Sequence, residues 1–478
     1  MAHRQGNCQF LMHQGKVLRS LSSELAGKVL LLKRKALSKV VLEALFEAAC
    51  RVVLVTATSG LVGYATAGQP IEKTTKVRHH TVPRTALGSR AITSKTAIPD
   101  LAEQRLLEVY QLAANANSRE ALEKVRSLVR DYPNFQLAQL VYGDMLSARI
   151  RPVGAVGDLP VNLQKEAAPA LASLRDESRL RVSAVKDRPR AGAIPEQFLA
   201  LSPNTRHVIA VDGAKSRLYL FENRQTGLRL VADFYTSIGK SGLEKSKEGD
   251  SRTPLGVYFI TSTRDPKSLS DFYGAGALPI NYPNVLDRKR GKTGTGIWLH
   301  GTPSTRFSRP PLDTNGCVVL ANPDLMRIMQ TVGTTNGTPV VIATQLKWVT
   351  PESIRPAGKT FDEVLETWRN AKASGNLDQL LGSYSPDFES YSRTLTDWRG
   401  VMKGEVDRLH GRKLQLKNVS ILRWTDTTDT MIVTFDQTAD DAPFGSTTRQ
   451  YWSRQTGQWK IFFEGPTSRP QGRNSKSS

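Results

Sequence analysis

The sequence predicts a multidomain protein with an α-helical N-terminal unit, a β-rich central domain and a C-terminal α+β domain. Its 478 residues suffice for two to four domains. Apolar residues recur at helical spacing within residues 100–200 and gather in short strand-like runs over 205–345. Helices followed by strands then return over 358–465. We therefore expect three folded parts, each with its own core.

The N-terminal residues 1–67 are expected to direct export. Nine Lys or Arg and three acidic residues fill positions 1–51, the apolar run 52–64 follows, and Ala65-Thr66-Ala67 resembles a cleavage site. The apolar run is shorter than the roughly 20 residues that a spanning helix needs. A cleaved signal and a weak membrane anchor both remain open, and either places the protein in the periplasm. Residues 68–99 have the composition of a linker.

Residues 100–150 predict three helices, which begin after Pro99-Asp100 and are interrupted at 115–118 and at Asp131-Tyr132-Pro133. Helix, helix, Pro and helix resemble a tetratricopeptide-type unit. Only about one and a half repeats are visible, too few for a free-standing solenoid. The unit continues to residue 200 through a helix near 163–180, followed by a linker that ends at Pro203. We expect it to serve as a scaffold, to pack on a neighbouring domain or to form a homodimer.

The central domain contains the chemistry-bearing motif. Gly296-Ile297-Trp298-Leu299-His300-Gly301-Thr302 predicts a buried strand that ends at His300, and Asn315-Gly316-Cys317 leads into another apolar run, 318–320. A thiolate attacks as a nucleophile, and a nearby imidazole lowers its pKa and carries the proton. Beyond the motif, Asn322-Pro323-Asp324 predicts a helix start with Asn322 as the N-cap.

The number of cysteines favours a catalytic Cys317. The other two, Cys8 and Cys50, precede the apolar run of the export segment. After cleavage, one cysteine would remain in an oxidising compartment without an intramolecular disulfide partner. Such a thiol is a candidate nucleophile, whereas the alternative is that Cys317 is a small buried side chain.

The paired motif resembles the catalytic signature of the L,D-transpeptidase (YkuD-type) family, as does the stretch 249–258, which contains Thr253-Pro-Leu-Gly256. The resemblance implies an enzyme that cleaves peptidoglycan stem peptides after meso-diaminopimelate or an L-residue, through a cysteine acyl-enzyme. It makes Cys317 the nucleophile, His300 the general base and the Gly301 carbonyl the group that orients the imidazole. Backbone N–H groups of Gly316 and Cys317 would form the oxyanion hole.

One position departs from the family pattern. The usual Ser-His-Gly-Cys is here Thr314-Asn315-Gly316-Cys317. Because His300 is the residue that matches the base, we expect activity to be retained. Asn315 and Thr314 are expected to contact substrate or the loop, and the exchange bears on substrate choice more than on catalysis.

Residues 358–465 resemble the nuclear-transport-factor-2-like (NTF2-like) cone, with helices followed by an antiparallel sheet. Such folds bind in a pocket or dimerise, so this domain is a second candidate for a homodimer contact. Together with the helical unit and the catalytic domain, it resembles a subgroup that includes the L,D-carboxypeptidases that set cell shape in curved bacteria. The tail 466–478 is rich in Ser and Arg and is expected to be disordered.

Two activities share the same acyl-enzyme chemistry. An amine acceptor gives a transpeptidase, which family membership favours slightly, and a water acceptor gives an L,D-carboxypeptidase that trims tetrapeptide to tripeptide. A non-catalytic wall-binding or scaffold protein is the alternative of another class.

The net charge of +22 calls for an anionic partner or reflects a basic surface. No nucleic-acid recognition motif is present, so nucleic acid is not expected, and anionic cell-wall polymers or lipid head groups would explain the charge equally well. The seven histidines are scattered without zinc-site spacing, and neither a metal nor a cofactor is expected.

Overall fold

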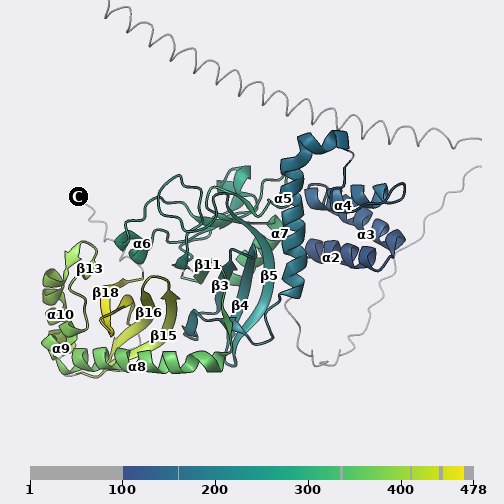
Figure 1. Cartoon of the computed structure of the whole chain (residues 1–478). Helices are drawn as coiled ribbons and strands as arrows, with labels where there is room; N and C mark the ends of the chain where they lie inside the picture. Colours follow the sequence, from purple (N-terminus) through teal and green to yellow (C-terminus); the bar gives the residue numbers. More distant parts are fainter. Residues whose placement is uncertain (1–100, 160, 334–336, 410–411, 441–444, 468–478) are drawn as a thin grey trace, which may run out of the picture. The chain divides into compact units, whose positions relative to one another are not determined.

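The computed structural model describes residues 101–159, 161–333, 337–409, 412–440 and 445–467 (Figure 1). The predicted export segment, the linker after it and the tail beyond residue 467 lie outside these ranges. Within the described ranges, no helix combines the length and the apolar character required to cross a membrane. Helices, a β-rich domain and a C-terminal α+β domain follow one another as predicted, which confirms the fold class.

The helical unit buries the apolar faces predicted from the sequence. Leu106, Val125, Leu128 and Val141 pack in one core, as their helical spacing requires. The long fourth helix lies between the three shorter helices and the sheet of the central domain (Figure 1). The tetratricopeptide resemblance and a homodimer remain predictions. The helices are α2 (Leu101–Ala114), α3 (Ser118–Asp131), α4 (Gln136–Ser147) and α5 (Val161–Lys186).

The central domain is organised around a mixed sheet with the strand order β6-β11-β3-β4-β5-β10-β8-β7, and β9 pairs with β5. Its strands are β3 (His207–Asp212), β4 (Arg217–Arg224), β5 (Gly227–Gly239), β6 (Gly256–Phe259), β7 (Ala277–Pro279), β8 (Trp298–His300), β9 (Leu312–Thr314), β10 (Val318–Leu320) and β11 (Pro339–Ala343). Its short helices are η1 (Pro266–Ser268), η2 (Asp271–Tyr273), α6 (Val285–Lys289) and α7 (Asn322–Val332).

Two apolar clusters use the side chains of this sheet. One cluster joins the strands to α7 through Leu325, Ile328 and Val332. The other contains Tyr219 and Phe259 together with apolar residues of the C-terminal sheet. The central strands are therefore almost continuously apolar, as expected for a sheet covered on both faces.

The C-terminal domain folds three helices over a five-stranded antiparallel sheet with the order β18-β17-β16-β15-β2. Trp368, Phe435 and Trp452 are among the largest fully buried side chains of its core. The helices are α8 (Pro351–Ser374), α9 (Leu377–Gly382) and α10 (Leu395–Leu409). The strands are β13 (Glu389–Ser390), β14 (Arg393–Thr394), β15 (Leu414–Thr425), β16 (Asp429–Ala439), β17 (Ser446–Gln455) and β18 (Gln458–Pro466).

Two expectations about local structure were wrong. The linker expected up to Pro203 contains β1 (Ile194–Pro195), which pairs with β12 (Trp348–Val349), and β2 (Phe198–Ala200), which joins the C-terminal sheet at β15. Asn322 is not the N-cap of α7; Ala321 is, because the Asn322 side chain bonds to other loops.

Candidate active site

Strands β8 and β10 bring the two halves of the sequence motif side by side. They run parallel, with Val318 opposite Leu299 and Val319 opposite His300. Leu299 and Val318 point into the apolar cluster below. Because side chains alternate along a strand, His300 and Cys317 lie on the opposite face from these two residues. The structure therefore places the predicted base and nucleophile on the same face of two neighbouring inner strands.

His300 is buried and held in a fixed orientation. Its side chain is almost inaccessible, and Nδ1 lies 2.7 Å from the Gly301 carbonyl oxygen, which can accept only when Nδ1 carries the proton. Nε2 is then the nitrogen that can accept a proton. Burial lowers the pKa of His300 to about 4, the Gly301 carbonyl opposes this shift, and the charge of Arg309 adds to it. The imidazole is thus neutral near pH 7.

Gly301 is required by the close approach of Asn322. A Cβ at position 301 would lie 2.0 Å from Asn322 Oδ1 and 2.9 Å from the Ala275 nitrogen. Asn322 Oδ1 accepts hydrogen bonds from the backbone N–H groups of Ala275 and Thr302, and its Nδ2 donates to the Thr302 carbonyl. Asn322 therefore holds the backbone that presents the Gly301 carbonyl to His300.

Cys317 is half-buried, and its Sγ lies 3.5 Å from the Gly296 carbonyl oxygen. Burial raises the pKa of the Cys317 thiol, while the Trp298 N–H and the charges of Arg309 and Lys245 pull it down. The sequence led us to expect that the imidazole lowers this pKa, but His300 is not among the groups that shift it in this structure. A buried neutral imidazole supplies no positive charge, so the site holds a thiol and a neutral base.

The turn before Cys317 is shaped by Gly316 and two threonines. Gly316 has φ +121°, and a Cβ there would lie 2.6 Å from the Arg252 carbonyl oxygen, so a side chain is excluded. The Gly316 N–H donates to Thr314 Oγ1 at 3.0 Å, and Thr314 Oγ1 donates to the Cys317 carbonyl at 2.7 Å. Thr253 Oγ1 donates to the Gly316 carbonyl at 2.9 Å. Because its N–H is occupied within the turn, Gly316 does not offer the oxyanion donor that the sequence suggested.

Asn315 and Thr314 were both expected near the substrate. Asn315 is exposed at the tip of the turn, so its amide faces solvent. Thr314 is buried, and its hydroxyl is used to hold the turn. Asn315 is therefore free of the turn's own hydrogen bonds to the Thr314 hydroxyl, whereas Thr314 holds the backbone at Cys317.

Three residues that shape this site were not predicted from the sequence. Thr253 lies in the Thr-Pro-x-Gly stretch, which could have pointed to it. Asn322 was interpreted as a helix cap. Arg309 lies in the loop between His300 and Cys317, where it is one of several polar residues, and its position depends on contacts that no local pattern reveals.

Family comparisons match two parts of the chain. Residues 206–342 match the L,D-transpeptidase catalytic domain, YkuD, and residues 360–465 match the Cds6 C-terminal NTF2-like domain. Both matches agree with the resemblances found in the sequence. No curated protein matches the chain.

Several solved structures are similar to parts of the chain. Bd1075 of Bdellovibrio bacteriovorus is 26% identical, with 58% of this chain and 100% of that chain covered and a TM-score of 0.48. The helical cell shape determining protein Pgp2 of Campylobacter jejuni is 20% identical, with 61% and 100% covered and a TM-score of 0.45. An L,D-transpeptidase of Xylanimonas cellulosilytica is 20% identical, with 30% and 63% covered and a TM-score of 0.20.

Proposed function

We propose that the protein is a periplasmic cysteine enzyme that acts on peptidoglycan stem peptides. The proposal starts from the match of residues 206–342 to an L,D-transpeptidase catalytic domain. The observation that carries the proposal is the pairing of β8 with β10. It sets a buried, neutral imidazole with a fixed tautomer beside the strand that Cys317 immediately precedes. Such an imidazole is suited to take a proton from a thiol.

The proposed reaction proceeds through a thioester. Cys317 Sγ attacks the carbonyl carbon of the third stem residue while His300 Nε2 takes the thiol proton. His300 then gives this proton to the nitrogen of the terminal D-residue, the peptide bond breaks and the D-residue leaves. The Cys317 N–H is the backbone donor that we assign to the oxyanion, since the Gly316 N–H is already bonded. A second nucleophile then attacks the thioester, which releases Cys317.

The nature of the second nucleophile separates two activities. We propose an amine acceptor, which makes the protein an L,D-transpeptidase. A water acceptor would make it an L,D-carboxypeptidase, and the C-terminal match to a Cds6-type NTF2-like domain is the observation that keeps this second candidate. Exposed Asn315, beside the nucleophile, is a residue that an amine acceptor can contact.

The proposal is tested by incubating the purified protein with disaccharide-tetrapeptides and separating the products, with Cys317→Ala in parallel. We expect cross-linked dimers, or exchange of the terminal D-residue, and a rate reduced at least about 1000-fold in the variant, because the covalent intermediate is lost. Tripeptide as the only Cys317-dependent product would identify the carboxypeptidase. Absence of any product, together with a Cys317 thiol that resists alkylation, would support the wall-binding scaffold instead.

A further inference from the structure

The loop between the base and the nucleophile is attached to the helical unit. Asn134 Nδ2 donates to the Ser304 carbonyl at 2.9 Å, and the Phe307 N–H donates to the Asn134 carbonyl at 3.0 Å. Phe307 is buried in the core of the helical unit, 4.4 Å from the Phe135 ring centre. Ser308 Oγ donates to Glu177 Oε1 of α5 at 2.7 Å. The loop is therefore fixed on both sides of Phe307, immediately before Arg309.

Arg309 is held at its backbone and directed toward the site. Its carbonyl oxygen accepts a hydrogen bond from Tyr235 Oη at 3.0 Å. Its guanidinium lies 4.9 Å from the centre of the Phe272 ring, and that ring in turn packs 5.6 Å from the imidazole of His300. The charge of Arg309 is felt at both catalytic groups, where it lowers the pKa of His300 and of Cys317.

Among the described residues, the Arg309 guanidinium has no ion-pair partner. Its Nη1 donates to the Asp313 backbone carbonyl at 3.2 Å, whereas the Asp313 carboxylate lies 3.5 Å from Arg306 instead. Its Nε is buried and has no hydrogen-bond partner in the described part of the chain. No described carboxylate forms an ion pair with it. The charge of Asp313 acts on Arg309 from a distance and raises its pKa against the effect of burial. A partly buried cation without an ion-pair partner is still costly, and a ligand carboxylate that reaches it recovers that cost.

We propose that Arg309 binds a carboxylate of the stem peptide beside the scissile bond, and so selects anionic peptides as substrates. The proposal rests on the proposed function for the identity of the ligand. A stem peptide offers two carboxylates near that bond: the free carboxylate of diaminopimelate and the carboxylate of the terminal D-residue. The helical unit acts through the loop, because its contacts to Ser304, Phe307 and Ser308 set where Arg309 stands.

The test measures binding, so it does not depend on turnover. Full-length Cys317→Ala is titrated with tetrapeptide by calorimetry, alone and combined with Arg309→Gln or Arg309→Lys. We expect Arg309→Gln to raise Kd tenfold or more, because a charge-assisted hydrogen bond is lost. Arg309→Lys keeps the charge without the fork and should lose less. Arg306→Gln is the matched control, an exposed arginine three residues earlier in the same loop, and should change Kd less than twofold.

Amidated peptides identify the carboxylate. A tetrapeptide amidated on diaminopimelate, and one amidated at the terminal D-residue, are titrated with the same variants. The peptide whose Kd no longer changes on Arg309→Gln lacks the carboxylate that Arg309 binds. Equal Kd values for the unmodified tetrapeptide with and without the Arg309→Gln change would overturn the inference, as would an equal loss on all three peptides. Thermal unfolding of each variant checks that the fold is intact.

The two proposals fail in different ways. If tetrapeptide binding depends on Arg309 but the wild type shows no Cys317-dependent turnover, the proposed activity is wrong and the inference about Arg309 holds. If the wild type turns over tetrapeptide but Kd does not depend on Arg309, the inference is wrong and the proposed activity holds. Absence of tetrapeptide binding by every form of the protein would overturn the inference together with the stem-peptide substrate.

Discussion

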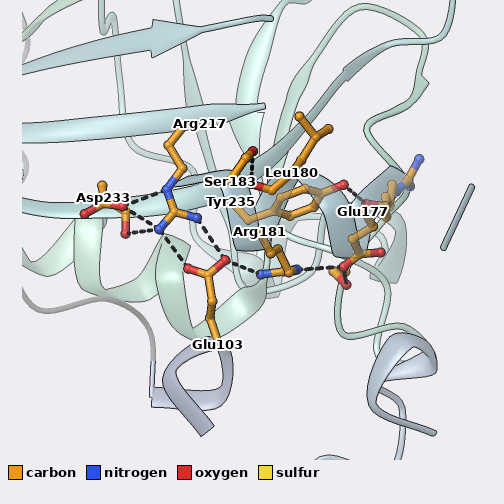
Figure 2. Close-up of polar contacts among 10 residues, drawn as sticks. Glu103, Glu177, Leu180, Arg181, Ser183, Arg217, Asp233 and Tyr235 are labelled. Carbon is orange, nitrogen blue, oxygen red and sulfur yellow. Dashed lines mark hydrogen bonds and ion pairs between the residues drawn. The ribbon is translucent and has the colours of Figure 1, made fainter. Parts of the chain in front are cut away.

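The catalytic domain meets its two neighbours through contacts of different character. Toward the helical unit, the apolar contact of Phe307 is joined by a network of buried charges. Arg217 bonds to both Glu103 and Asp233, and Arg181 bonds to Glu103 and Glu177 (Figure 2). The side chains of all five are at most 4% exposed. Toward the C-terminal domain, the junction is an apolar cluster. Arg449 reaches this apolar cluster, and its guanidinium packs over the Phe259 ring rather than beside a carboxylate.

The difference bears on function because the charged junction continues into the active-site loop. Glu177 accepts from Arg181 and also from Ser308, the residue before Arg309. Tyr235, which holds the Arg309 carbonyl, lies under the Arg181 guanidinium at 4.0 Å. Buried ion pairs are directional, whereas apolar contacts tolerate small displacements. The helical junction is therefore suited to fix the loop, and the C-terminal junction to hold two domains together.

Replacing Arg217 with Met should give the largest effect on stability. The change leaves Glu103 and Asp233 buried with one fewer cation each, and losing one partner of a buried ion pair costs about 3–5 kcal/mol. The free energy of opening of α2–α5 can be measured by native-state hydrogen exchange, which separates the helical unit from the rest of a multidomain chain. We expect reduced protection throughout these four helices.

The matched control is Arg224→Met, on the same strand as Arg217. Arg224 pairs with Glu222 at 2.7 Å, but both side chains are at least one-third exposed, so this change should cost at most about 1 kcal/mol. Equal costs for Arg217→Met and Arg224→Met would mean that the buried network adds nothing to the helical junction. The comparison of the two junctions would then lose its basis.

Acidification should stop catalysis before it breaks the helical junction. The pKa of His300 is lowered by burial to about 4, so the base is neutral above that pH and becomes protonated as the pH falls through it. We expect kcat/KM to fall about tenfold per pH unit below 4, since this ratio reports the free enzyme. An acid limb near the ordinary pKa of histidine would show that His300 is hydrated in solution.

The junction should survive this titration because the pKa of Glu103 lies below that of His300. Burial would raise the pKa of Glu103, but Arg217 and Arg181 lower it to about 2. A depressed pKa gives stability that is complete above the ordinary value of 4.5 and is lost gradually as the pH falls towards 2. Hydrogen exchange of α2–α5 at pH 4 is the control, and it should keep most of the protection seen at pH 7, because pH 4 is still well above the folded pKa of Glu103.

The sequence predicted what is local and missed what is long-range. Helical spacing located α2, α3 and α4, and the paired motif located His300, Gly301 and Cys317. Nothing local indicates that Phe307 enters the core of a unit about 170 residues earlier, or that β2 completes a sheet whose other strands begin at Leu414. Such contacts depend on the whole fold. The strands β1 and β2 are also too short to show an alternating pattern.

Replacing Arg290 with Gln should give the smallest effect and tests the C-terminal junction. Arg290 Nη2 donates to Asp426 Oδ1 at 2.8 Å, and both side chains remain about one-quarter to one-third exposed. Asp426 keeps hydrogen bonds from Trp424 Nε1 and from the Thr428 N–H after the change, so it is not left bare. We expect a cost below about 1 kcal/mol in the urea unfolding of the C-terminal domain. A cost as large as that of Arg217→Met would show that charges hold both junctions, because the apolar cluster would then be insufficient to join the sheets.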